Sequence, residues 1–166
     1  MNFDFLNAFS DNTRLWLYQS PREFSADELS WIGAEGSKFA EGWQTHGAEM
    51  KATVTVLYNR FVVIASDQEV TANSGCSIDS SVRFIKQLEL KTGLNLMDRM
   101  LVYYLNTNGE PVSFHFHDLN KLVESGVLTD ETPIFNPLVN TKPELMNNWL
   151  LPLKASWLSS FMKQTT

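Results

Sequence analysis

Apolar and polar positions recur with helical spacing in two stretches of the chain. In the first, Ser25 and Glu28 have the spacing of a capping box, and apolar residues continue on one helical face toward Gly47, the expected stop. The second stretch covers residues 76–92 and meets Gly93, a residue type that commonly ends helices. These patterns predict two long helices, each with one apolar face for packing.

Short runs that are rich in β-branched and aromatic residues predict strands. The runs cover residues 14–18, 52–58, 61–65, 100–105 and 111–116. Asn59 and Arg60 separate the second run from the third, and Asn108 and Gly109 separate the fourth from the fifth. Each of these pairs of runs is therefore expected to form a tight hairpin.

The order of these elements predicts an α+β protein with a ferredoxin-like β-α-β-β-α-β antiparallel sheet. An added strand at 111–116 and carboxyl-terminal helices at 118–125, 143–150 and 155–162 would complete it. The sequence has no internal repeat and no Pro/Gly-rich linker, so we expect a single domain over residues 1–166. Residues 1–12 show no clear periodicity and are interpreted as a loose arm.

The predicted topology brings three reactive side chains together. The turn at Asn59 lies at one end of its hairpin, so the start of the first strand and the end of the second lie at the opposite end. His46 precedes that first strand, Asp67 follows the second, and Cys76 opens the next helix after a short loop. We therefore expect these three residues to converge.

Cys76 is the candidate nucleophile of this end of the molecule. A catalytic cysteine needs an adjacent base and donors for a developing oxyanion. His46 could be the base, Asp67 could orient it, and the helix start could supply backbone N–H groups. The candidate ligand-binding residues around them are Ser74, Gly75, Ser77, Asp79 and Arg14. Two other interpretations stay open: noncovalent binding of a small anion at the same helix start, and a buried cysteine with only a packing role.

The charge balance narrows the classes of partner. The 166 residues include 13 Lys and Arg against 19 Asp and Glu, which gives a formal net charge of -6. Because nucleic-acid binding depends on clustered basic residues, we do not expect it here. No basic-then-apolar leader is present, and no apolar run reaches the roughly 18 residues that span a bilayer. Together with the single cysteine, this indicates a cytoplasmic protein without disulfides.

The histidines do not form a convincing metal site. His115 and His117 alternate on an expected strand, so both rings could face one side as ligands. His46 is expected at the opposite end of the sheet, and the only cysteine lies there as well. We therefore expect neither a metal nor a cofactor.

Several segments together resemble an uncharacterised family of short bacterial proteins that are sometimes labelled ABC transporter ATPases. The matching segments are residues 14–19, 43–47, Asp67 with 74–79, 98–99 and 135–141. The piece Ser-Gly-Cys-Ser-Ile-Asp at 74–79 is the most specific of them. The resemblance carries no established activity and therefore implies no catalytic role.

ATP hydrolysis is not expected despite that label. A P-loop requires Gly-x-x-x-x-Gly-Lys followed by Ser or Thr. Gly33 and Gly36 are too close together and lie within a predicted helix, and Ser37 separates Gly36 from Lys38.

Two functions from different classes remain. The first is a ligand-binding or thiol-dependent site formed by His46, Asp67 and Cys76. The second is a noncatalytic interaction or assembly protein that uses its aromatic surface and carboxyl-terminal helices. The apolar run at 149–153 could dock on the open face of the sheet or form a contact in a homodimer, and the dimer would involve Trp149 or Trp157.

Overall fold

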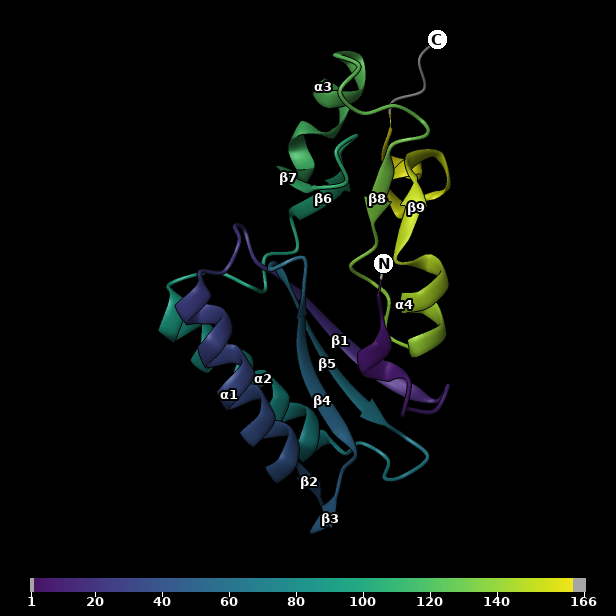
Figure 1. Cartoon of the computed structure of the whole chain (residues 1–166). Helices are drawn as coiled ribbons and strands as arrows, with labels where there is room; N and C mark the ends of the chain where they lie inside the picture. Colours follow the sequence, from purple (N-terminus) through teal and green to yellow (C-terminus); the bar gives the residue numbers. More distant parts are fainter. Residues whose placement is uncertain (1, 163–166) are drawn as a thin grey trace.

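The computed structural model describes residues 2–162 and has an α+β architecture with two main antiparallel sheets. The first sheet has the order β1-β5-β4, formed by β1 (Thr13–Gln19), β4 (Ala52–Leu57) and β5 (Phe61–Asp67). One face of it is covered by α1 (Ala26–Gly42) and α2 (Gly75–Thr92), as Figure 1 shows. A small hairpin of β2 (Gln44–Thr45) and β3 (Ala48–Glu49) connects α1 to β4.

The second sheet lies beyond one end of the first (Figure 1). It has the order β7-β6-β8-β9, formed by β6 (Leu101–Leu105), β7 (Pro111–His115), β8 (Pro133–Phe135) and β9 (Leu150–Pro152). Two more helices follow in the chain: α3 (Leu119–Glu124) after β7, and α4 (Lys142–Asn148), which lies between β8 and β9 in sequence and contacts β1. The expected helix at 155–162 is instead made of short 3-10 segments, Leu153–Ala155 and Trp157–Phe161.

The strand order departs from the ferredoxin-like arrangement. The expected strand at 100–105 does form, but as β6 it pairs with β7 and β8 in the second sheet rather than with β1. The outer edge of β1 is instead met by residues near α4. The N–H of Leu15 donates to the carbonyl of Asn140 at 2.8 Å, and Arg14 forms an isolated bridge with Thr141. A short segment thus takes part of the place that a fourth strand would fill.

The core lies on both faces of β5, which is the central strand of the first sheet. Val62 and Ile64 face α1 and α2, whereas Phe61, Val63 and Ala65 face the opposite side. All five are 0% exposed. A strand that is covered on both faces is expected to be continuously apolar, as this one is.

The second face is covered by the N-terminal segment and by residues that follow β5 in the chain, including Trp149. Trp149 lies there with its ring centroid 5.2 Å from that of Phe61 and 5.0 Å from that of Phe135. It is 1% exposed, so it docks on the sheet and is not available for a contact between copies. Leu6, from the 3-10 turn Asp4–Leu6, is also 1% exposed. The segment expected to be a loose arm is therefore packed against the core.

The expected start of α1 is confirmed, but the helix ends earlier than expected. The Ser25 side chain accepts a hydrogen bond from the N–H of Glu28, and the Glu28 carboxylate accepts one from the N–H of Ser25. At the other end, Trp43 turns inward and its Nε1 donates to the carbonyl of Ser77 at 2.9 Å. Gly47 does not stop α1. With a φ of 79°, it forms the β2–β3 turn together with His46.

Candidate functional site

Cys76 lies in the first turn of α2 and is exposed. The helix begins with a reciprocal cap. The Ser74 side chain accepts from the N–H of Ser77, and the Ser77 hydroxyl accepts from the N–H of Ser74. These hydroxyl groups are therefore occupied in holding the helix start. Cys76 is thus not the buried packing residue that one interpretation of the sequence suggested.

The β2–β3 hairpin is anchored beside this helix start. The Thr45 hydroxyl donates to Oγ of Ser74 at 2.6 Å, and Trp43 reaches the carbonyl of Ser77. His46 follows Thr45 directly and is exposed at the hairpin turn, where it adopts a φ of 48°. The structure therefore brings the segments that carry His46 and Cys76 to the same end of the first sheet.

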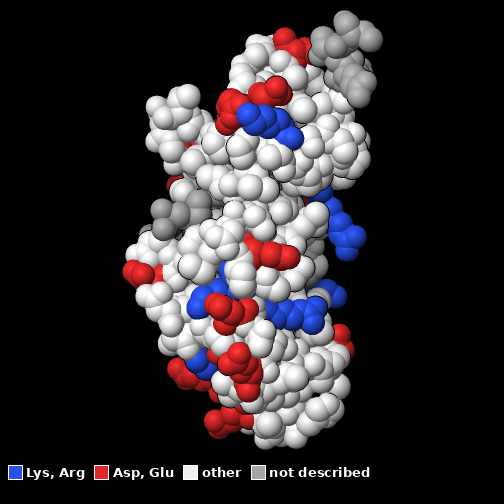
Figure 2. Space-filling view, turned by 90° about the vertical axis from the view of Figure 1, so that its right-hand side faces the viewer, with Lys and Arg blue, Asp and Glu red and all other residues white. Residues whose placement is uncertain are grey.

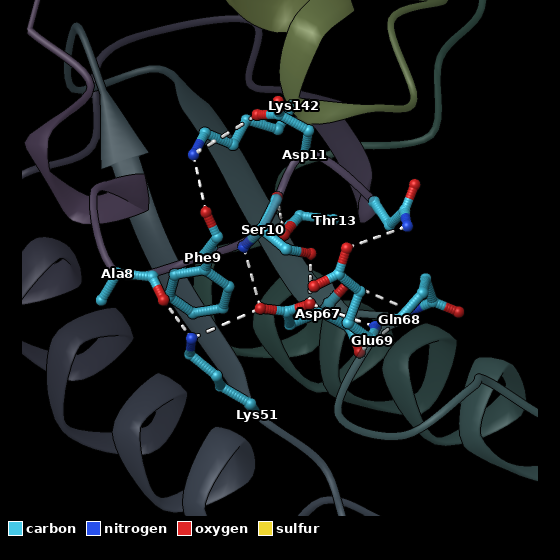
Figure 3. Close-up of polar contacts among 12 residues, drawn as sticks. Ala8, Phe9, Ser10, Asp11, Thr13, Lys51, Asp67, Gln68, Glu69 and Lys142 are labelled. Carbon is cyan, nitrogen blue, oxygen red and sulfur yellow. Dashed lines mark hydrogen bonds and ion pairs between the residues drawn. The ribbon is translucent and has the colours of Figure 1, made fainter.

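Asp67 lies at this end too, but it is buried in a different network (Figure 3). Its carboxylate accepts hydrogen bonds from the N–H of Ser10 at 2.9 Å and from the Ser10 hydroxyl at 2.6 Å. It also accepts from the N–H of Glu69 at 3.2 Å and pairs with Nζ of Lys51 at 3.3 Å. Among the described residues, its hydrogen bonds thus go to the N-terminal segment, to its own loop and to Lys51 just before β4, and none goes to His46.

The same network fixes the N-terminal segment to the sheet. Nζ of Lys51 also donates to the carbonyl of Ala8, and Nζ of Lys142 donates to the carbonyl of Phe9 at 2.6 Å (Figure 3). Burial alone would raise the pKa of Asp67. The hydrogen bonds from Ser10, Glu69 and Lys51 outweigh that effect and hold the pKa at about 2, below its ordinary 3.8. Asp67 is therefore a charged residue that clamps the N-terminal segment to the end of β5.

The remaining predicted ligand-binding residues are spread over this end of the molecule. Asp79 is exposed on α2, and Gly75 lies in its first turn, where an added Cβ would meet nothing within 4 Å. The guanidinium of Arg14 lies over the ring of Trp16, 5.0 Å from its centroid. The space next to the first turn of α2 is thus open.

A hollow that the sequence analysis missed lies near the opposite end of β1. It has a volume of about 450 Å³ and is lined by residues of three segments: the end of β1, the connection from α2 to β6, and the loop after β8. Tyr18, Gln19, Arg99 and Leu138 are among its lining residues. No local pattern could reveal it, because the three segments are distant in sequence and meet only when the second sheet docks.

Charge and metal-binding groups do not single out another site. His115 and His117 have ring centroids 4.8 Å apart, yet residues 2–162 contain no group of three or more metal-ligating side chains. Acidic and basic side chains are interspersed on the face shown in Figure 2. Within residues 2–162, no helix is both long and apolar enough to cross a membrane.

Comparisons with known proteins found no matching family model, no similar curated protein and no similar solved structure.

Proposed function

We propose that the protein acts on a small electrophilic substrate through the thiol of Cys76. The observation that carries this proposal is that the thiol is exposed in the first turn of α2, beside the hairpin that presents His46. A cysteine is effective as a nucleophile only when its thiolate is accessible to the substrate. The exposure of Cys76 meets that requirement.

The surrounding groups suggest how an addition to a carbonyl carbon would proceed. Sγ of Cys76 forms the new bond, its proton passes to the imidazole of His46, and the carbonyl electron pair moves onto oxygen. The N–H groups of Gly75 and Cys76 precede the first intrahelical bonds of α2, and neither donates a hydrogen bond to another described residue. These donors would stabilise the oxyanion. Without a reactive substrate, the same donors would bind a small anion.

Asp67 has a supporting role in this proposal. Because its carboxylate is engaged by Ser10 and Lys51, it maintains the end of the sheet from which the β2–β3 hairpin and α2 extend. The proposed reactive pair therefore consists of Cys76 and His46, without a third member that orients the imidazole.

Alkylation of the native protein tests this proposal. We expect iodoacetamide to label Cys76 faster than it labels free cysteine at the same neutral pH, with the adduct located by mass spectrometry. His46→Gln should slow the labelling several-fold, whereas His115→Gln, a matched change far from the thiol, should leave the rate unchanged. Equal rates for the wild type, His46→Gln and free cysteine would contradict a role for His46.

The assembly function remains a second candidate because one aromatic cluster reaches the surface. Phe161 is 53% exposed and packs edge-on against Phe116, which stacks on Trp157. A homodimer through this cluster would be weakened by Phe161→Ser, and sedimentation velocity over a range of concentrations would detect the change.

We propose that β1, α1, β4, β5 and α2 are a ferredoxin-like core from which the fourth strand has been displaced. The order β1-β5-β4 with two helices on one face supports this relation. A cytoplasmic location is proposed because the single cysteine is exposed and unpaired, which suits a reducing compartment.

A further inference from the structure

The outer edge of β1 is only partly covered. In an antiparallel strand, the backbone groups of alternate residues point toward the same neighbour. The N–H of Leu15 points outward to Asn140, and the N–H of Ser20 points inward to the carbonyl of Arg60. By this alternation, the N–H and C=O of Leu17 point outward as well. Neither forms a hydrogen bond across that edge with another described residue.

The hollow lies directly against this uncovered part of the edge, because Leu17, Tyr18 and Gln19 line it. Contacts between the two sheets hold it open. Nε2 of Gln19 donates to the carbonyl of Leu101 at 2.9 Å, and the Tyr103 hydroxyl donates to the carbonyl of Ser20 at 2.5 Å. These bonds fix the start of β6 at the tip of β1, so β6 cannot lie along the edge. Along the part of β1 that the segment near α4 leaves uncovered, the position of a fourth strand is therefore an open hollow.

The walls of the hollow combine apolar surface with one unpaired cation. Leu138 is 67% exposed and Met97 is 38% exposed, and both line the hollow. Arg99 also lines it, and its guanidinium has no hydrogen bond or ion pair with a described residue. The neighbouring Asp98 carboxylate is instead occupied by the N–H of Met100. An unpaired guanidinium beside exposed apolar side chains favours a ligand that is apolar and anionic.

We propose that this hollow binds the carboxyl-terminal end of an extended apolar peptide by strand addition. The peptide backbone pairs with the outward N–H and C=O of Leu17 and forms a short fourth strand of the first sheet. Its side chains contact Met97 and Leu138, and its terminal carboxylate pairs with Arg99. A peptide fits better than a compact small anion, because it alone satisfies the backbone donor and acceptor of the strand edge as well as the cation. This site is independent of the thiol of Cys76.

Titration of the full chain with acetyl-Ala-Val-Leu tests the proposal by two-dimensional amide NMR. We expect saturable shifts confined to Leu17–Gln19, 96–99 and 137–138, together with slower hydrogen exchange of the Leu17 amide. Arg99→Gln should weaken the affinity roughly tenfold or more, as should amidation of the peptide carboxylate. Arg83→Gln, which removes an exposed arginine of α2, should leave the affinity unchanged.

Three outcomes would overturn the proposal. The first is the absence of saturable shifts with a Kd below about 1 mM. The second is an unchanged affinity in Arg99→Gln. The third is equal binding of acetate with no protection of the Leu17 amide, because that result would identify a simple anion site. None of these outcomes depends on the reactivity of Cys76, so failure here and failure of the thiol-dependent function are distinguishable.

Discussion

Asp67 carries a charge in a nearly sealed environment, and it fixes the N-terminal segment to the end of the first sheet. It is 2% exposed and accepts hydrogen bonds from Ser10, Glu69 and Lys51. Hydrogen bonds to a charged group are stronger than those between neutral groups, and a buried carboxylate without them would be strongly destabilising. The segment before β1 is therefore held by electrostatics as well as by the packing of Leu6.

Asp67→Asn is expected to lower the free energy of unfolding by about 2 kcal/mol at neutral pH, because the amide cannot replace the charge-assisted bonds to Ser10 and Lys51. Urea denaturation measures this change. Asp11→Asn is the matched control, because Asp11 is exposed and lies 3.9 Å from Lys142, its ion-pair partner among residues 2–162. Equal stabilities for the two variants would contradict the role of Asp67 in holding the N-terminal segment.

The contribution of Asp67 should also depend on pH in a defined direction. Its pKa is about 2 in the folded state and 3.8 in its ordinary state, so the unfolded chain binds the proton more readily. The stabilisation is therefore fully present above about pH 5 and is lost as the pH falls through 4 toward 2. The difference in stability between the wild type and Asp67→Asn should shrink over that range.

The role of Asp67 illustrates what the sequence could not provide. Its position after β5 was predictable from the hairpin pattern, and so was its arrival at the same end as Cys76. Its partner Ser10 was not predictable, because Ser10 lies in a segment without periodicity that packs against the core through Leu6. The exposure of Cys76 likewise depends on how Ser74 and Ser77 cap the helix, which leaves the side chain between them directed to the surface.

The long helices and hairpins were predictable because their signals are local, as the capping residue Ser25 and the stop at Gly93 illustrate. The pairing partner of β6 was not predictable, because a strand with the same apolar pattern can pair with β1 or with a later strand. Contacts between distant segments determine which strand β6 pairs with. The hydrogen bond from the Gln19 side chain to the carbonyl of Leu101 is one of these contacts.

Helix α1 offers a matched pair of glycines for testing how packing competes with helix propensity. An added Cβ at Gly33 would meet nothing within 4 Å, whereas at Gly36 it would lie 3.0 Å from Cβ of Val54. Gly33→Ala should therefore raise the free energy of unfolding by roughly 0.5–1 kcal/mol. Gly36→Ala should gain less or become destabilising, because α1 would have to move away from β4. Thermal unfolding of both variants measures the difference in their stability. Equal gains in the free energy of unfolding would contradict the close approach of Gly36 to Val54.

The two sheets depend on one shared core, and Trp149 is central to it. Its indole contacts Phe61 of the first sheet and Phe135 of the second, and its N–H has no hydrogen-bond partner among the described residues. Its contribution is therefore packing alone. Loss of this side chain should weaken both halves of the molecule together.

Trp149→Ala is expected to lower the free energy of unfolding by about 3–5 kcal/mol, since a large buried ring is replaced by a cavity. Amide hydrogen exchange should accelerate in both β5 and β6. Trp149→Phe should cost much less, because no hydrogen bond is lost, and Met146→Ala, on the exposed side of α4, should change stability by less than about 0.5 kcal/mol. Faster exchange in β6 alone would indicate that the sheets unfold independently.

Trp149 follows β5 after a long stretch of chain, and this order has a consequence for synthesis on the ribosome. The face of β5 that carries Phe61, Val63 and Ala65 is made well before Trp149, which covers part of it. Until Trp149 is made, a nascent chain with its first sheet formed leaves part of this apolar face uncovered. We expect such a chain to be retained by chaperones that recognise exposed apolar segments, and to be released once Trp149 has docked.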